Sequence, residues 1–135
     1  MASPETDYHA WLTETAELIE HGRWEDVDLE GLAGELRGLA RAQVRDLQRA
    51  ITRWLAAGAH RDREAASSEM AIIRDRLMRS PSLADYEALR QRVHTAWREV
   101  ARQLRAEGVR VPHVSYQALD QAAGKIRWRL GSAIW

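Results

Sequence analysis

Hydrophobic residues recur every three or four positions along most of the chain, which is the spacing of one face of an α-helix. The longest run predicts a single long helix, or two collinear helices, over residues 29–57. Its apolar members are Leu29, Leu32, Leu36, Ala40, Val44, Leu47, Ile51 and Trp54. Strand-like alternation is weak, because only residues 109–111 could pair and one short strand cannot form a sheet. The pattern therefore predicts an all-α protein.

Shorter stripes predict the remaining helices, one ending at Gly22 and others over about 68–79, 82–107 and 115–134. We expect a single-domain helical bundle of five to six helices over residues 1–135, with the long helix at its centre. The long helix and the helix over 82–107 should pack at a shallow angle as the spine. The residues expected at the core are Trp11, Leu36, Ile51, Val93, Trp97 and Val100.

Capping residues and glycines mark the expected helix ends. Gly34 and Gly38 lie four apart inside the long helix, so they predict either a shallow groove for a second helix or a kink near Gly38. Both alternatives stay open at this point. The predicted caps are Asp28, Ser115, and Ser82 with Asp85 as a capping box.

The composition is that of a globular protein, with 45% hydrophobic and 30% charged residues among 135. The absence of cysteine excludes disulfides, thiolate zinc sites and a cysteine nucleophile, and it is consistent with a reducing compartment. The first residues lack the basic start and apolar run of a signal peptide, and no stretch is apolar enough to span a bilayer. We therefore expect a cytoplasmic protein that does not bind or span a membrane.

Charge is distributed unevenly, although the net charge is zero. Residues 1–50 carry eleven acids and five bases, a balance of −6, and residues 51–135 carry nine acids and fifteen bases, a balance of +6. The simpler interpretation is that the two oppositely charged parts pack on each other. The alternative is a basic surface that binds an acidic partner or a phosphate backbone.

The motifs of residues 7–36 occur in a distinctive order. The chain reads Asp7-Tyr8-x-x-Trp11, then Gly22-Arg23-Trp24, then Asp28-Leu29-x-x-Leu32-Ala33-x-Glu35-Leu36. This order resembles the opening of a bacterial family known as domain of unknown function 29. Later landmarks that resemble the family are Ile73-Arg74, Leu77, Ser80-Pro81-Ser82-Leu83, Trp97 and Tyr116-x-x-Leu119-Asp120. The resemblance covers nearly the whole chain. It implies an all-helical fold and a family to which no reaction has been assigned.

The chain departs from this family in one neighbourhood. Family members usually carry Lys-Trp-Gln and then an aromatic-Gln-Pro just past the long helix, where this chain has Leu55-Ala-Ala-Gly-Ala-His60. A Ser-Trp pair that usually opens the next helix is here Ser68-Glu69. Both changes remove aromatic bulk, so a family site at residues 55–69 would be lost or altered.

No catalytic or metal-binding signature is present. None of the five histidines has a strong metal-ligand spacing, and Glu17 with His21, four apart, predicts a surface pair rather than a ligand pair. The glycines of residues 31–38 lack the Lys-Ser/Thr of a phosphate loop. We therefore predict no catalytic residue, no metal site and no cofactor. We expect the chain to be a binding protein rather than an enzyme.

The strongest candidate surface is the C-terminal end, where basic residues alternate with tryptophan. Its residues are Lys125, Arg127, Trp128, Arg129 and Trp135. Such a cluster can serve as a protein-interaction patch, or it can bind nucleic acid through charge and stacking. It can also pack on a neighbouring helix with its bases in water. We expect a non-catalytic helical interaction module with a protein partner or a second copy of itself, and a nucleic-acid-binding module as the alternative.

Overall fold

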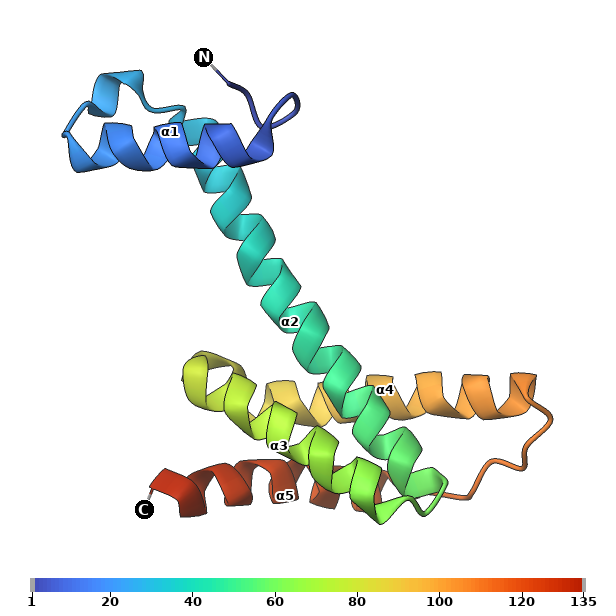
Figure 1. Cartoon of the computed structure of the whole chain (residues 1–135). Helices are drawn as coiled ribbons and strands as arrows, with labels where there is room; N and C mark the ends of the chain where they lie inside the picture. The colour runs from blue at the N-terminus through green and yellow to red at the C-terminus, as the bar shows by residue number, and fades with distance from the viewer. Residues whose placement is uncertain (1, 135) are drawn as a thin grey trace. The chain divides into compact units, whose positions relative to one another are not determined.

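The structure is a computed structural model that describes residues 2–134, with side-chain detail for residues 2–128. Its described part contains five α-helices and two short 3-10 helices, and no strand (Figure 1). The all-α prediction and the single long helix are confirmed. In chain order the elements are α1 (Tyr8–Glu20), η1 (Trp24–Asp26), α2 (Leu29–Ala59), α3 (Arg63–Arg79), η2 (Pro81–Ala84), α4 (Tyr86–Ala106) and α5 (Tyr116–Ile134).

Two predicted helix caps are confirmed by hydrogen bonds to backbone amides. Asp28 Oδ1 accepts from the Gly31 N–H at 2.9 Å, and Ser115 Oγ accepts from the Ala118 N–H at 3.1 Å. These side chains satisfy amides that the first turn of a helix otherwise leaves unpaired. Gly22 has a φ of 69°, the left-handed conformation expected at the end of α1.

Two predicted helix starts are wrong. Residues 81–84 form η2 with Pro81 at its first position, so α4 begins only after Asp85, whose Oδ2 accepts from the Ala88 N–H at 3.0 Å. Asp85 is therefore the cap itself, and no capping box with Ser82 exists. Helix α3 begins at residue 63 rather than 68, because Asp62 supplies an N-cap that accepts from the Ala65 N–H at 3.0 Å.

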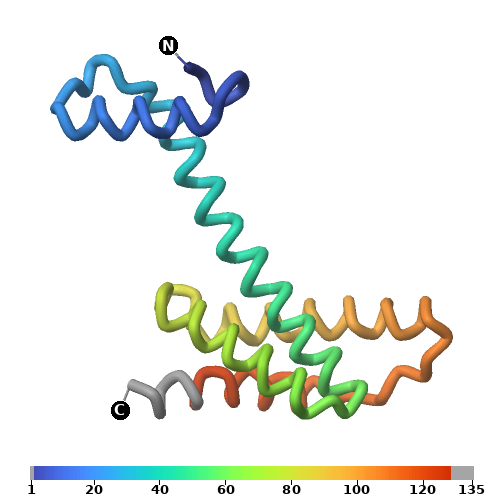
Figure 2. The backbone as a smooth tube through the Cα atoms, viewed as in Figure 1, coloured from blue at the N-terminus to red at the C-terminus, as the bar shows by residue number. Residues whose placement is uncertain are grey.

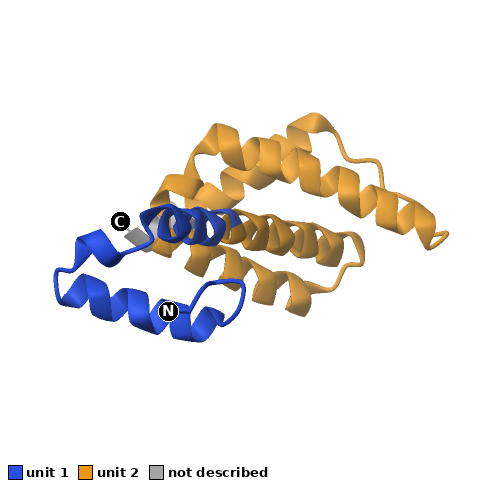
Figure 3. Cartoon of the chain, turned by 90° about the horizontal axis from the view of Figure 1, so that it is seen from above, with its two compact units in different colours: residues 1–41 blue, residues 42–135 orange. Residues whose placement is uncertain are grey.

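The chain divides into two compact units, residues 1–41 (unit 1) and residues 42–135 (unit 2), shown in different colours in Figure 3. Unit 1 contains α1, η1 and the first part of α2. Its buried side chains are Trp11, Thr15 and Val27. The hydroxyl of Tyr8 donates to Glu35 Oε2 at 2.8 Å and so connects α1 to α2 within this unit.

Unit 2 contains the rest of α2 and the three helices that follow. Its core is formed by side chains that are almost inaccessible to water. The largest fully buried side chains are Leu47, Ile51, Ile73, Leu77, Leu89, Ile126, Val93 and Val100. The closest helix pair is α4 with α5, which run in opposite directions after the connection of residues 107–115 (Figure 2). The expected spine of α2 and α4 is therefore replaced by α4 and α5, and α2 joins through side chains such as Gln48, whose Nε2 donates to the Arg92 carbonyl at 2.9 Å.

The predicted core residues fall into three groups. Trp11, Ile51, Val93 and Val100 are buried as expected, and Trp97 is half-buried against the unit 2 core. The prediction that Leu36 is buried is wrong, because this residue is 58% exposed. A helical stripe identifies the apolar face of a helix, but a second element must cover that face to bury it.

The two helical glycines do not form a packed groove. A Cβ built on Gly34 would meet no atom within 4 Å, and one on Gly38 would meet only the guanidinium end of Arg41 at 3.9 Å. The groove interpretation is therefore wrong within the chain, and α2 is one uninterrupted helix through both positions. No helix in the described part of the chain is long and apolar enough to cross a membrane.

Candidate functional site

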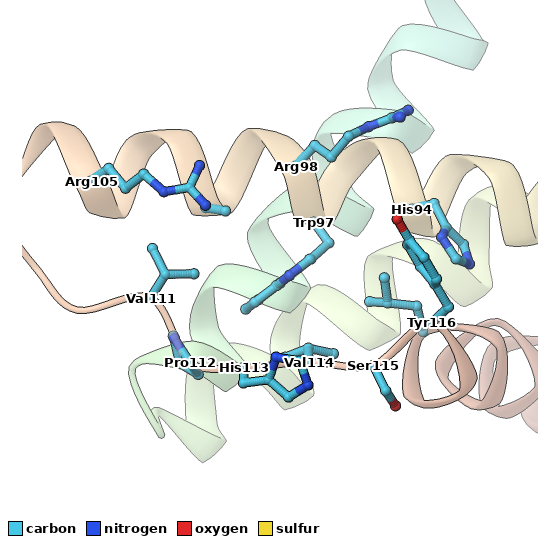
Figure 4. Close-up of a pocket in the computed structure, with 12 residues that line it drawn as sticks. His94, Trp97, Arg98, Arg105, Val111, Pro112, His113, Val114, Ser115 and Tyr116 are labelled. Atoms are coloured by element: carbon cyan, nitrogen blue, oxygen red, sulfur yellow. The ribbon is translucent and has the colours of Figure 1, made fainter.

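A cavity of about 940 Å³ opens in unit 2 between α4, the connection of residues 107–115 and the start of α5 (Figure 4). The connection forms one wall because it cannot continue either helix. Gly108, with a φ of 73°, ends α4, and Pro112 favours an extended backbone before Ser115 caps α5. The lining residues are His94, Trp97, Arg98, Ala101, Arg105, Val111, Pro112, His113, Val114, Ser115, Tyr116 and Leu119.

Apart from one tyrosine, the ionisable side chains that line this cavity are all basic. Arg98, Arg105, His94 and His113 line it, and no carboxylate does. Among the described residues, no carboxylate lies within ion-pair distance of either arginine. In Figure 4 the Arg105 side chain lies along α4 on the side that faces Trp97, whereas Arg98 points away from the connection. Arg105 is therefore the cation best placed to meet a bound group.

One end of the cavity is held by a hydrogen bond and an ion pair that share Asp120. The His94 Nε2 atom lies 2.7 Å from Asp120 Oδ1, and the same oxygen lies 3.7 Å from Arg90 Nη1. Tyr116 stacks on the His94 ring with centroids 5.4 Å apart. These contacts fix α4 against α5 and hold the imidazole at the cavity wall.

Arg90 also binds Glu87, one turn earlier on α4, through two hydrogen bonds of 3.0 and 2.6 Å. These hydrogen bonds, with the attraction between the two charges, lower the pKa of the Glu87 carboxyl and raise that of Arg90. Both groups remain ionised near neutral pH and keep the Arg90 side chain oriented towards Asp120.

A second, more apolar hollow of about 370 Å³ adjoins the first. The two share Trp97, Pro112, Val114 and Leu119 as lining residues. This space is left open by four small residues in its lining, namely Gly58, Ala59, Ala118 and Ala122. Residues 55–60, where we expect a departure from the family pattern, contribute Leu55, Gly58 and Ala59 to this hollow.

The predicted C-terminal patch is separate from both cavities. Lys125, Arg127 and Trp128 are exposed on α5, and 72% of Trp128 is accessible, so this ring does not cover a neighbouring helix. The side chains of Arg129 and Trp135 lie outside the described residues. The patch thus presents two bases and one aromatic ring to solvent.

The Glu17 and His21 pair of α1 makes a local contact rather than a joint ligand set. The His21 Nδ1 atom contacts the backbone oxygen of Glu17 at 2.7 Å rather than its carboxylate. In the described part of the chain, no group of three His, Cys, Asp or Glu side chains could hold a metal ion.

Unit 1 carries a second candidate surface. Leu29, Leu36 and Leu39 lie on one side of α2, within about 80° of arc at 100° per residue, and each is 58% to 59% exposed. We call these three residues the unit 1 stripe. Tyr8, Leu12 and Trp24 of the same unit are also exposed. Large apolar side chains that gather at the surface of a small unit are typical of a binding site.

The units differ strongly in formal charge. Residues 1–41 carry ten acids and three bases, a balance of −7, and residues 42–135 carry ten acids and seventeen bases, a balance of +7. The apolar stripe therefore belongs to the acidic unit, and the exposed Trp128 belongs to the basic one.

Sequence reasoning missed the cavity and its residues. Asp120 belongs to the quoted Tyr116-x-x-Leu119-Asp120 motif, but His94 lies 26 residues earlier in the chain. Nothing in the spacing of these residues indicates that they meet, because their contact depends on how α4 turns back into α5. That no carboxylate lines the cavity beside Arg98 and Arg105 likewise becomes visible only in three dimensions.

A comparison of the sequence with known protein families finds one match, which covers most of the chain. The model described as "Domain of unknown function DUF29" matches residues 5–122. The chain belongs to the DUF29 family. No curated protein and no solved structure matches it. The DUF29 match includes both cavities but ends before the Lys125 to Trp128 patch.

Proposed function

We propose that this DUF29 chain is a non-catalytic protein-interaction module that associates with a second copy of itself. The acidic unit 1 of one copy would cover the basic end of α5 in the other. The observation that carries the proposal is the unit 1 stripe, three exposed leucines on one side of α2. The absence of cysteine suits action in the reducing cytoplasm, where we place it.

Burial of apolar side chains would supply the driving force. Full burial of a leucine contributes roughly 1.5–3 kcal/mol relative to leaving it exposed. Three leucines covered even in part can therefore offset much of the entropy lost when two chains associate. Trp128 provides an aromatic anchor of the kind enriched at protein interfaces.

The opposite charges of the two units favour a second copy of the chain as the partner. Unit 1 has a balance of −7 and unit 2 a balance of +7, so each copy offers the complement of both of its own surfaces. Complementary potentials accelerate encounter and disfavour wrong partners, and both effects weaken as salt is added.

The nucleic-acid alternative has its own supporting observation. Lys125, Arg127 and Trp128 are exposed together, as a stacking and phosphate-binding site requires. The acidic unit 1 would repel a phosphate backbone, so we favour the protein partner. A gel shift with mixed-sequence single-stranded DNA in low salt, lost in Trp128→Ala, would support the alternative instead.

Sedimentation velocity of single-site variants tests the proposal. Leu36→Glu places a charge in the middle of the stripe and should shift the protein towards monomer. Thr13→Glu adds the same charge at an exposed polar position of α1 and is the matched control, which should associate like the wild type. Equal sedimentation of the two variants would contradict a role for the stripe.

A further inference from the structure

We propose that the cavity between α4 and α5 is a binding site for a small amphipathic anion, a molecule with one carboxylate or phosphate group on an aromatic or branched apolar body. The DUF29 match and the self-association proposed above do not assign this site. It is built entirely within unit 2, so it is independent of the unit 1 stripe.

The electrostatics of the two adjoining hollows favour an anion. Their linings contain Arg61, Arg98 and Arg105 with two histidines, and neither lining contains an acid. The Arg105 side chain lies along the cavity side of α4 (Figure 4). Among the described residues, no carboxylate forms an ion pair with Arg105. A guanidinium without a protein carboxylate can pair with a carboxylate or phosphate through two parallel hydrogen bonds.

The shape of the hollows favours an apolar body joined to that anion. The smaller hollow, about 370 Å³, is lined by Trp54, Leu55 and Ala122 and shares Trp97 with the larger one. Volumes of about 300–1,000 Å³ with mostly apolar walls and a few polar groups are typical of small-molecule sites. The ligand would place its charged group beside Arg105 and its body beyond Trp97.

The wall of the site is held in place before any ligand binds. His94 is fixed by Asp120 at 2.7 Å and by the stacked Tyr116 ring. Ser115 is occupied as the cap of α5, and Gly108 sets the direction in which the connection leaves α4. Such preorganisation reduces the entropy that a ligand must overcome.

The test is a titration of the full chain with 1-naphthoate, followed by nuclear magnetic resonance at the Trp97 indole N–H. We expect a saturable shift, and we expect the isosteric neutral 1-naphthamide to bind about tenfold more weakly, since it lacks the charge that Arg105 meets. A parallel titration with 1-naphthyl phosphate decides whether a carboxylate or a phosphate is preferred.

Two variants and a control localise the site. Arg105→Gln should weaken naphthoate binding about tenfold. Arg102→Gln removes a neighbouring exposed arginine of α4 that does not line the cavity, and it should leave the affinity unchanged. Ala118→Trp fills the smaller hollow from an exposed position and should abolish binding.

The proposal is overturned if naphthoate gives no saturable shift, if the amide binds as tightly as the acid, or if Arg105→Gln and Arg102→Gln bind equally. None of these results depends on the oligomeric state. Failure of this site and failure of self-association are therefore distinguishable.

Discussion

The Tyr8 hydroxyl donates a 2.8 Å hydrogen bond to Glu35 Oε2, 27 residues along the chain. It is a side-chain link between α1 and α2 inside unit 1. The bond raises the pKa of Tyr8, and desolvation and the negative charge of Glu35 raise it further. This link holds α1 on the first part of the helix that carries the unit 1 stripe.

The first prediction concerns the pH dependence of this link. Because the folded pKa of Tyr8 is raised, its contribution to stability is complete below the unfolded value of about 10 and is lost as pH rises through the folded value. Tyr8→Phe should therefore be less stable than the wild type at neutral pH and equally stable at strongly alkaline pH. Urea unfolding across this range, with absorbance at 295 nm to follow ionisation, is the measurement. A stability difference that does not change with pH would refute the link.

The second prediction compares two leucines on different helices. Leu89 is fully buried in unit 2, so Leu89→Ala should cost about 2–5 kcal/mol of unfolding free energy. Leu36 is exposed, so Leu36→Ala should change stability by no more than about 0.5 kcal/mol at low protein concentration. Chemical denaturation of dilute samples checks both values. A large loss for Leu36→Ala would mean that the stripe is covered within the monomer.

The third prediction uses glycines in opposite conformations. Gly34 is helical and open, so Gly34→Ala should stabilise the protein by up to about 1 kcal/mol. Gly22 has a φ of 69°, so Gly22→Ala should destabilise it by roughly 1–2 kcal/mol. Thermal melts of the two variants should shift in opposite directions. A destabilised Gly34→Ala would restore the packed groove that the sequence suggested.

The fourth prediction concerns the start of α4. Asp85→Ala removes the acceptor of the Ala88 N–H and should cost about 1 kcal/mol. Ser82→Ala is the matched control inside η2, where no side-chain cap is made, and it should be nearly neutral. Unfolding by guanidinium resolves the difference. Equal losses would mean that Ser82 also caps the helix.

The sequence predicted the helices well because their information is local. The stripe of α4 needs only the spacing of Leu89, Val93 and Val100, and each of these residues is buried. Asp28 and Ser115 cap helices whose first amides lie three residues away. Such features depend on neighbours along the chain, so they can be read without knowing the fold.

The features that sequence reasoning missed are set by packing between distant segments. Tyr116 continues the stripe of α5, yet it is 78% exposed, and its one aromatic neighbour among the described residues is His94 at the rim of the cavity. Leu36 has the same periodicity as Ile51, but Ile51 is buried in the core cluster of unit 2 and Leu36 is exposed. Periodicity does not indicate which part of a stripe finds a partner, and the cavity beside Arg105 exists only once α5 returns along α4.

Self-association is the central claim, and its most direct test is sedimentation equilibrium of the full chain at low and high salt. The account predicts a mass approaching twice the 15.4 kDa of the chain in low salt, falling towards the monomer as salt screens the attraction between the units. A mass of 15.4 kDa at every concentration and salt level would contradict it.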